Sequence, residues 1–353
     1  MTNPIVEKIF DPAQPISEPG IYVMTEDQYH ADPCATPSLS SSVGKKCLPM
    51  GTGTGTARHM WHNHPRLNPP EADEGDELAT KRFDLGSVFH TIILGKGAEI
   101  TIIDAKDWRT KDAKAARDDA LAANRQPVLI EQMTRARAML AAAIPQIEIR
   151  PELHEAMSKG RPERVLVWRE ETPAGPILCR CMLDWLPDHG EAFPDWKTTG
   201  ASAGPDDYGR TYFDIGADFQ DAFYRRGIRA VLNRRARLIF PVIETAAPHC
   251  LMVHQTMPAS LAMADRKVQY AISLFGVCLH ENIWPGFPVE TASQEAPPWI
   301  ENKWTDREDA GMTGTDFTSR MIEELKNMPR LGLTFDREFA DDFGLTAHED
   351  ADK

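Results

Sequence analysis

Residues 177–199 constrain the fold of this chain more than any other segment, because they predict two short strands with ionisable side chains at their ends. Side chains alternate between the two faces of an extended strand, so Asp184 ends the more polar face of the first strand. A turn then leads into residues 192–199, where Asp195 and Lys197 are two apart and share a face. The segment therefore predicts that two carboxylates and one ammonium group converge.

This group of side chains is typical of metal-dependent phosphodiester hydrolysis. Two carboxylates and a backbone carbonyl, here that of Trp196, suit Mg²⁺, which prefers oxygen ligands, and Mn²⁺ can substitute for it. A bound cation lowers the pKa of an attacking water and neutralises charge on the phosphodiester, while a lysine such as Lys197 can orient that water or take its proton. The triplet alone is a weak indication, because most D-x-K tripeptides are solvated surface charges.

The spacing D-x₁₀-D-x-K resembles the PD-(D/E)XK nuclease superfamily, and other stretches resemble its RecB-type and exonuclease VIII (RecE-type) branch. Three motifs carry the resemblance: a G-x-x-x-H helix, the strand before the first aspartate, and a Q-x-x-x-Y helix. They lie at Gly86–His90, Glu163–Trp168 and Gln220–Tyr224. The resemblance also takes in Leu39–Ser42, Trp108–Lys111 and Trp284–Phe287, and it covers roughly residues 20–288. One departure is Asp195, where many relatives have glutamate.

The resemblance implies an α/β fold with a PD-(D/E)XK restriction-endonuclease-like core, in which helices flank a central mixed β-sheet. It divides the chain into a mainly helical N-terminal part (1–160), a nuclease core (161–288) and an acidic, partly disordered C-terminal extension (289–353). The implied activity is a Mg²⁺-dependent exodeoxyribonuclease that degrades linear double-stranded DNA from its ends, 5′ to 3′, and generates single strands for phage-type recombination. The implied partners are double-stranded DNA ends, a single-strand annealing recombinase and further copies of the chain in a ring.

The resemblance also assigns roles to individual residues. The metal ligands are His90, Asp184, Asp195 and Trp196, Lys197 activates water, and the substrate-positioning residues are Gln220, Tyr224 and Glu163. Simpler interpretations compete for three of these side chains. A lone histidine on an apolar helix is more often a hydrogen-bonded core residue, Tyr224 can be a packing residue, and Glu163 can be a solvated glutamate at a strand edge.

One dense basic tract follows the Q-x-x-x-Y motif, and after a nuclease core it predicts phosphate contacts. Its members are Arg225, Arg226, Arg229, Arg234, Arg235 and Arg237. The alternative is an exposed helix end with favourable dipole interactions. The net charge of −14 does not exclude DNA binding, because screening confines each charge to about 10 Å at ordinary salt.

Composition predicts a cytoplasmic protein with no membrane segment, since the chain has no 18-residue apolar run and no signal-like N-terminus. Six cysteines without a C-x-x-C pair predict reduced core thiols. His59, His62 and His64 lack the cysteine or acid spacing of a zinc site and are predicted to lie on the surface.

Hydrophobic periodicity predicts helices at residues 81–94, 104–123, 128–144, 206–226, 260–280 and 319–326, and strands at 163–170, 238–244 and 250–255. Two other functions stay open at this stage. One is a flap or single-strand repair nuclease, and the other is a non-catalytic DNA-end-binding protein.

Overall fold

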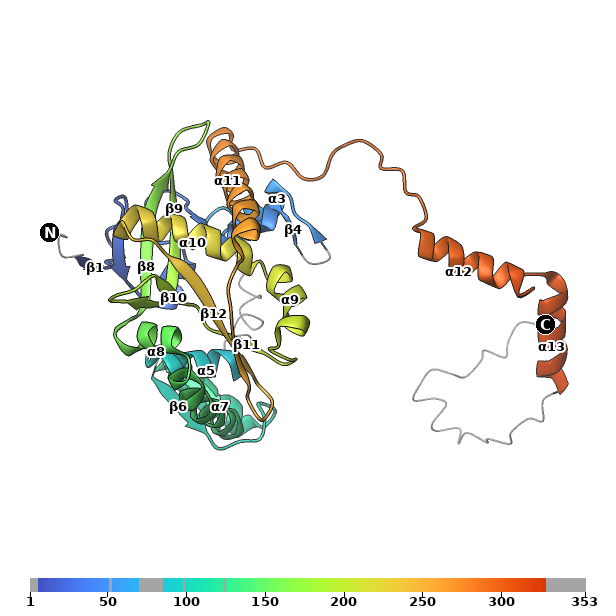
Figure 1. Ribbon diagram of the computed structural model, residues 1–353, viewed down its shortest axis with the longest axis horizontal. Helices are drawn as coiled ribbons and strands as arrows, with labels where there is room; N and C mark the ends of the chain where they lie inside the picture. Colours follow the sequence, from blue (N-terminus) through green and yellow to red (C-terminus); the bar gives the residue numbers. More distant parts are fainter. Residues whose placement is uncertain (1–5, 51–52, 70–84, 98, 124, 328–353) are drawn as a thin grey trace, which may run out of the picture. The chain divides into compact units, whose positions relative to one another are not determined.

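The computed structural model describes residues 6–50, 53–69, 85–97, 99–123 and 125–327. Its internal contacts divide the chain into two units, residues 1–287 and residues 288–353. The first unit holds every described strand (Figure 1). The second holds two helices, α12 (Pro298–Asp309) and α13 (Thr315–Asn327).

A five-stranded mixed sheet forms the centre of the first unit, as the sequence predicts. Its order is β1-β2-β8-β9-β3, with β1 at Glu7–Ile9, β2 at Gly20–Val23, β8 at Gly160–Glu170, β9 at Ile177–Pro187 and β3 at Leu39–Ser40. The long strands β8 and β9 are antiparallel, whereas β3 runs parallel to β9. Because β2 and β3 pair with the strands at residues 160–187, the expected N-terminal part and nuclease core share one sheet.

A second sheet shows that the strand predicted at 192–199 is wrong in two respects. The segment forms two strands, β10 (Ala192–Pro194) and β11 (Lys197–Thr199). Both pair in parallel with β12 (Arg237–Glu244) instead of forming a hairpin with β9. Strand β13 (Leu251–His254) pairs antiparallel with β12, and both strands lie where the sequence predicts strands. Between β10 and β11 the N–H of Asp195 still bonds β12, but the next N–H, from Trp196, turns towards Asp184.

Helices cover both sheets and extend the first unit (Figure 1). The longer helices are α5 (Leu85–Leu94), α6 (Lys111–Ala122), α7 (Ile130–Glu148), α8 (Pro151–Ser158), α9 (Pro205–Asp214), α10 (Ala217–Leu232) and α11 (Pro258–Glu281). The shorter elements are α1 (Glu26–His30), α2 (Ser41–Gly44), the 3₁₀ turn η1 (Lys45–Cys47) and α3 (Ala57–His62). The remaining strands form two small sheets, β4 (Pro49–Met50) with β5 (Gly53–Thr54), and β6 (Ile100–Ile103) with β7 (Gln126–Leu129).

Three helix predictions are wrong in their bounds. The helix predicted at 104–123 begins only at Lys111, where the Thr110 hydroxyl accepts from the N–H of Ala113 and caps it. Pro145 lies inside α7 and does not end it. The helix predicted at 206–226 is two helices, since Gly216 adopts a left-handed φ of 72° between α9 and α10. That conformation is readily available to glycine, so the chain can turn there and direct α10 across the central sheet.

The largest core cluster lies between α10, α11 and the strands β8, β9 and β12. Trp168 on β8 packs edge-on against Phe223 of α10, with ring centroids 5.0 Å apart. Gly227 permits this approach, because a Cβ there would lie 2.7 Å from the Trp168 ring. The close packing fixes α10 over the strands that carry the acidic residues.

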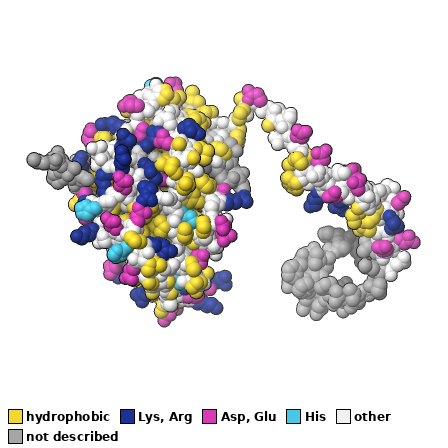
Figure 2. All heavy atoms as spheres, in the orientation of Figure 1, with side chains coloured by type: hydrophobic (Ala, Val, Ile, Leu, Met, Phe, Trp, Pro, Cys, Tyr) yellow, Lys and Arg dark blue, Asp and Glu magenta, His cyan; other side chains and the backbone are white. Residues whose placement is uncertain are grey.

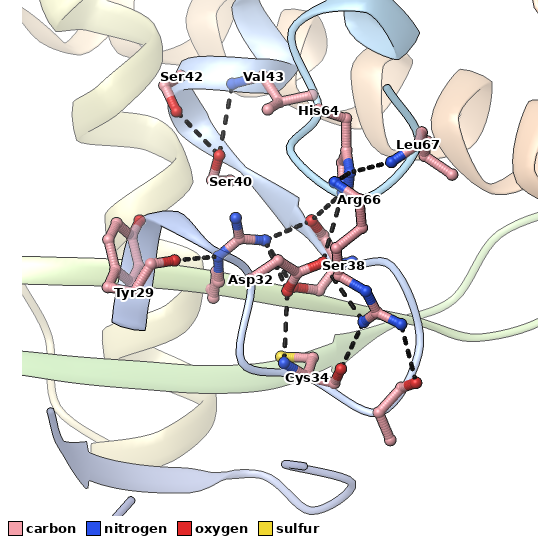
Figure 3. Close-up of polar contacts among 12 residues, drawn as sticks. Tyr29, Asp32, Cys34, Ser38, Ser40, Ser42, Val43, His64, Arg66 and Leu67 are labelled. Atoms are coloured by element: carbon pink, nitrogen blue, oxygen red, sulfur yellow. Dashed lines mark hydrogen bonds and ion pairs between the residues drawn. The ribbon is translucent and has the colours of Figure 1, made fainter. Parts of the chain in front are cut away.

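A buried polar network anchors the N-terminal segment to β9 (Figure 3). Arg180 is 2 % exposed, and its Nη1 donates to the carbonyl oxygen and the hydroxyl of Ser38 and pairs with Asp32 at 3.1 Å. The Asp32 carboxylate also accepts from the Ser38 hydroxyl at 2.6 Å. These contacts hold the chain just before α2 in one position.

The network corrects one histidine prediction. His64 is fully buried, not on the surface, and its Nε2 lies 3.2 Å from the Ser38 carbonyl. Its Nδ1 accepts from the N–H groups of Arg66 and Leu67. Burial lowers the pKa of His64 to about 4, so the ring is neutral at pH 7.

Six cysteines are free, and all but Cys250 are buried, in agreement with the predicted core thiols. Helix α13 agrees with the prediction at 319–326. The disorder expected at 347–353 lies outside the described residues. Among the helices of the described ranges, none has both the length and the apolar character that a membrane span requires.

Candidate metal and catalytic site

The first carboxylate, Asp184, lies near the end of β9 and connects three elements. Its Oδ2 accepts hydrogen bonds from Nε2 of His90 on α5, at 2.8 Å, and from the backbone N–H of Trp196, at 2.7 Å. Burial raises the pKa of Asp184, but the charge and hydrogen bond of His90, the charge of Lys197 and the Trp196 N–H together outweigh burial and lower it. Asp184 is therefore ionised at neutral pH.

His90 lies on the face of α5 that meets this strand, and it is neither fully buried nor surrounded by apolar side chains alone. Its side chain is 35 % exposed, and its ring points at a carboxylate. Burial lowers the pKa of His90, but the charge and hydrogen bond of Asp184, together with the charge of Asp195, outweigh burial and raise it to about 9. The ring is therefore protonated at neutral pH and must lose that proton to bind a metal through Nε2.

The second carboxylate, Asp195, is buried between β10 and β11. Its Oδ1 accepts from Nε2 of Gln220 at 2.8 Å, and its Oδ2 pairs with the Lys197 ammonium. Burial and the negative charge of Asp184 raise the pKa of Asp195 to about 6, although Lys197 lowers it. The two carboxylates are thus close enough to repel each other.

Lys197 faces the same point from β11. Its Nζ also lies over the ring of Phe240, 5.8 Å from the centroid. Burial lowers the pKa of Lys197, but Asp195 and Asp184 outweigh burial and raise it. The side chain is therefore a cation at neutral pH, which favours orienting water and neutralising charge over taking a proton.

Glu163 lies beside Asp184 on the neighbouring strand. In the β8–β9 pairing Pro162 is opposite Trp185 and Arg164 is opposite Leu183, so Glu163 is level with Asp184. Its φ of 51° is left-handed, which is uncommon for a residue with a Cβ and occurs more often at functional sites. Burial raises the pKa of Glu163, while the charge of His90 lowers it.

The Q-x-x-x-Y motif lies on the face of α10 that meets the site. Gln220 bonds Asp195 directly. Tyr224, one turn later, is 7 % exposed, and burial raises its pKa well above the usual value, with Asp195 and Asp184 adding to the effect. Trp196, whose backbone is a predicted ligand, packs its ring edge-on against Phe89.

Most of the predicted DNA-binding tract makes contacts within the protein. Arg225 pairs with Asp221, Arg226 with Asp265 and Glu170, and Arg237 with Glu152, while Arg234 donates to the carbonyls of Pro187 and Gly190. On the face seen in Figure 2, Lys and Arg side chains likewise have acidic neighbours. Arg229 and Arg235 are exposed and have no ion-pair partner within the described ranges, so they fit phosphate contact best.

Three side chains near the site were not predicted from the sequence. Lys45 and Tyr208 are close enough for the charges of Lys197 and Asp195 to influence their pKa values, and Lys96 influences that of Glu163. They come from distant segments, at η1, α9 and the end of α5. No local spacing links them to the acid, acid and lysine pattern.

The donor set suits a divalent cation in composition, although the present contacts would have to change. Across the described ranges, no three His, Cys, Asp or Glu side chains form a ready ligand group. His90 is hydrogen-bonded to Asp184, and Lys197 is paired with Asp195. A cation between the carboxylates would offset the repulsion that raises the pKa of Asp195, so the residues fit a hard metal ion.

An α/β fold whose sheets bring two aspartates and a lysine together defines a PDDEXK-like protein. Residues 72–292 match the family described as "PDDEXK-like domain of unknown function (DUF3799)", and the chain belongs to this family. No curated protein sequence matches the chain.

Two solved structures match parts of the chain at low sequence identity. One is described as a "Putative exonuclease" from Eubacterium rectale, with a TM-score of 0.49 and 12% identity, covering 80% of this chain and 97% of that chain. The other is the structure of SSO0001, with a TM-score of 0.25 and 11% identity, covering 56% of this chain and 85% of that chain.

Proposed function

We propose that this protein is a Mg²⁺-dependent exodeoxyribonuclease that degrades linear double-stranded DNA from its ends. The observation that supports this most strongly is that five side chains from separate elements converge. They are His90 on α5, Asp184 on β9, Asp195 between β10 and β11, Lys197 on β11 and Gln220 on α10. A purely structural cluster has no need of two repelling carboxylates in a buried position.

Mg²⁺ held by Asp184, Asp195, His90 and the Trp196 carbonyl would supply a water of lowered pKa and neutralise charge on the phosphodiester. Gln220 holds Asp195 Oδ1 and so fixes the direction of its other oxygen. The Lys197 ammonium orients the attacking water and stabilises the developing negative charge. Glu163 and Tyr224 position the substrate at the two flanks of this group.

We also propose 5′-to-3′ polarity, a role in phage-type recombination with a single-strand annealing recombinase, and a homo-oligomeric ring. These proposals rest on the resemblance of the G-x-x-x-H and Q-x-x-x-Y motifs to exonuclease VIII. The pairing of four arginines with protein acceptors limits the basic surface that one copy offers, and a ring would bring several copies of the exposed Arg229 and Arg235 around DNA.

The experiment is digestion of linear and covalently closed circular duplex DNA by the purified protein, with Mg²⁺ and with EDTA. We expect Mg²⁺-dependent loss of the linear form alone. Cutting of the circle would show an endonuclease, preference for flaps would support a repair nuclease, and binding to ends without cutting would support an end-binding protein.

A further inference from the structure

Lys45 is a half-buried cation beside the candidate site, and its ammonium group is held in place by the backbone. It is the first residue of η1, directly after α2. Its Nζ donates to the carbonyl oxygen of Ile215 at 2.8 Å. Ile215 follows α9 and precedes Gly216, which caps the helix that carries Gln220. Lys45 therefore contacts the junction of α9 and α10, at the start of the helix that carries Gln220.

Buried contacts fix the segment that leads to Lys45. Ser38 is held in the Arg180 network, and the Ser40 hydroxyl accepts from the N–H of Val43 and contacts Ser42 (Figure 3). Gly44 passes so close to α10 that a Cβ there would lie 3.0 Å from the Phe219 ring. The position of Lys45 is thus determined by packing and is not that of a free surface lysine.

The charges around Lys45 are mainly positive. Burial lowers its pKa, the ammonium groups of Lys197 and Lys46 lower it further, and Asp195 alone acts in the opposite direction. Within the described ranges no carboxylate forms an ion pair with Lys45. Lys197 is paired with Asp195, whereas Lys45 has no carboxylate partner of its own within the described ranges, so an anion bound at Lys45 would be stabilised by its charge.

We propose that Lys45 binds a phosphate of the DNA strand that is cut and so positions the scissile phosphodiester against Asp195 and Lys197. This proposal rests on the proposed function. An ammonium has three N–H donors, and the bond to Ile215 leaves two for phosphate oxygens. Lysine is a common phosphate ligand because it acts as a compact point charge.

The test measures binding of a short linear duplex by fluorescence anisotropy over a series of salt concentrations. Every variant carries Asp184→Asn, which prevents cleavage during the measurement. Lys45→Gln removes the charge but keeps a donor, Lys45→Met keeps the apolar stem, and Lys45→Arg keeps the charge. Lys303→Gln is the matched control, because it removes an exposed lysine from α12 in the other unit.

We expect Lys45→Gln and Lys45→Met to weaken binding about tenfold and to reduce the slope of log affinity against log salt by about one. Lys45→Arg should retain most of the affinity, and Lys303→Gln should match the parent. In the active protein, Lys45→Gln should lower kcat/KM about tenfold at an unchanged thermal midpoint.

Two results would overturn the proposal. One is that both neutral variants bind and cut like the parent, in which case wild-type cleavage still supports the nuclease. The other is that Lys45→Arg loses as much affinity as Lys45→Gln while both stay folded, because charge would then not be what binds. A wild type that neither binds nor cuts linear duplex contradicts the nuclease and the Lys45 proposal together.

Discussion

At the scale of single residues, Asp195 determines how the site should respond to pH. Its pKa is raised to about 6, so a proton and a divalent cation compete for the same carboxylate near neutral pH. We predict that cleavage at subsaturating Mg²⁺ falls at least about tenfold per pH unit below pH 6, because Asp195 and the His90 ring must both be free of their protons to bind the cation. The measurement is a pH–rate profile at two Mg²⁺ concentrations, and the higher concentration should move the apparent pKa down. A profile that is flat between about pH 5 and 7 would contradict the assignment.

The raised pKa of Asp195 affects stability in the opposite direction, because acid lowers the activity but stabilises the fold at this residue. A carboxyl whose pKa is raised on folding binds its proton more tightly in the folded state, so protonation stabilises that state. As the pH falls from about 6 towards the ordinary pKa of an aspartate, the contribution of Asp195 to the free energy of unfolding therefore becomes more favourable. This is why we regard Asp195 as a residue kept for chemistry and not for stability.

Glu163 allows its backbone and its charge to be tested separately. We predict that Glu163→Val lowers the free energy of unfolding by about 2 kcal/mol, since a β-branched residue is poorly tolerated at a φ of 51°. Glu163→Gln should leave stability within about 0.5 kcal/mol and lower kcat at least tenfold if the carboxylate positions substrate. Denaturant unfolding and single-turnover cleavage measure the two effects. Full activity in Glu163→Gln would limit Glu163 to a structural role.

At the scale of elements, the sequence correctly predicted the helices and strands that depend on local periodicity. The alternation along β9 and the helix that carries His90 both follow from spacing within a few residues. The split between β10 and β11 could not be read from the chain, because it depends on the Trp196 N–H turning to Asp184. Lys45 and the buried His64 are positioned by contacts with distant segments, so no local pattern indicates them.

The buried Asp32–Arg180 network holds the segment that leads into α2 and η1 against β9. We predict that Arg180→Met lowers the free energy of unfolding by about 3–5 kcal/mol, because it leaves the buried Asp32 charge without its main partner. The matched control is Arg169→Met on the neighbouring strand, whose pair with Glu18 is exposed, and it should cost less than about 1 kcal/mol. Urea unfolding of both variants gives the comparison. Equal losses would mean that burial of the ion pair does not matter.

At the scale of the whole molecule, negative charge is concentrated in the second unit. Residues 288–353 contain 16 acidic and 7 basic residues, so they account for nine of the fourteen net negative charges. The described helices α12 and α13 also expose large apolar side chains, including Trp299 and Trp304. The first unit is therefore much closer to neutral than the composition of the full chain suggests.

This distribution predicts the effect of ending the chain at Phe287. The first unit keeps all described strands and the whole candidate site, so the shortened protein should fold and cut linear DNA. Its affinity for DNA should rise several-fold at low salt, because nine net negative charges are removed, and the gain should shrink as salt is added. Anisotropy at two salt concentrations measures this. Weaker binding at low salt would show that the second unit contributes contacts to DNA.

Above all, we propose that Asp184 and Asp195 hold the cation that makes the chain a nuclease. The most direct test is single-turnover cleavage of a linear duplex across a Mg²⁺ titration, for the wild type, Asp184→Asn and Asp195→Asn. We predict that the wild-type rate rises and saturates with Mg²⁺, and that both variants bind DNA but lose at least about 10³-fold in rate at every concentration. Cleavage at the wild-type rate in either folded variant would contradict the account.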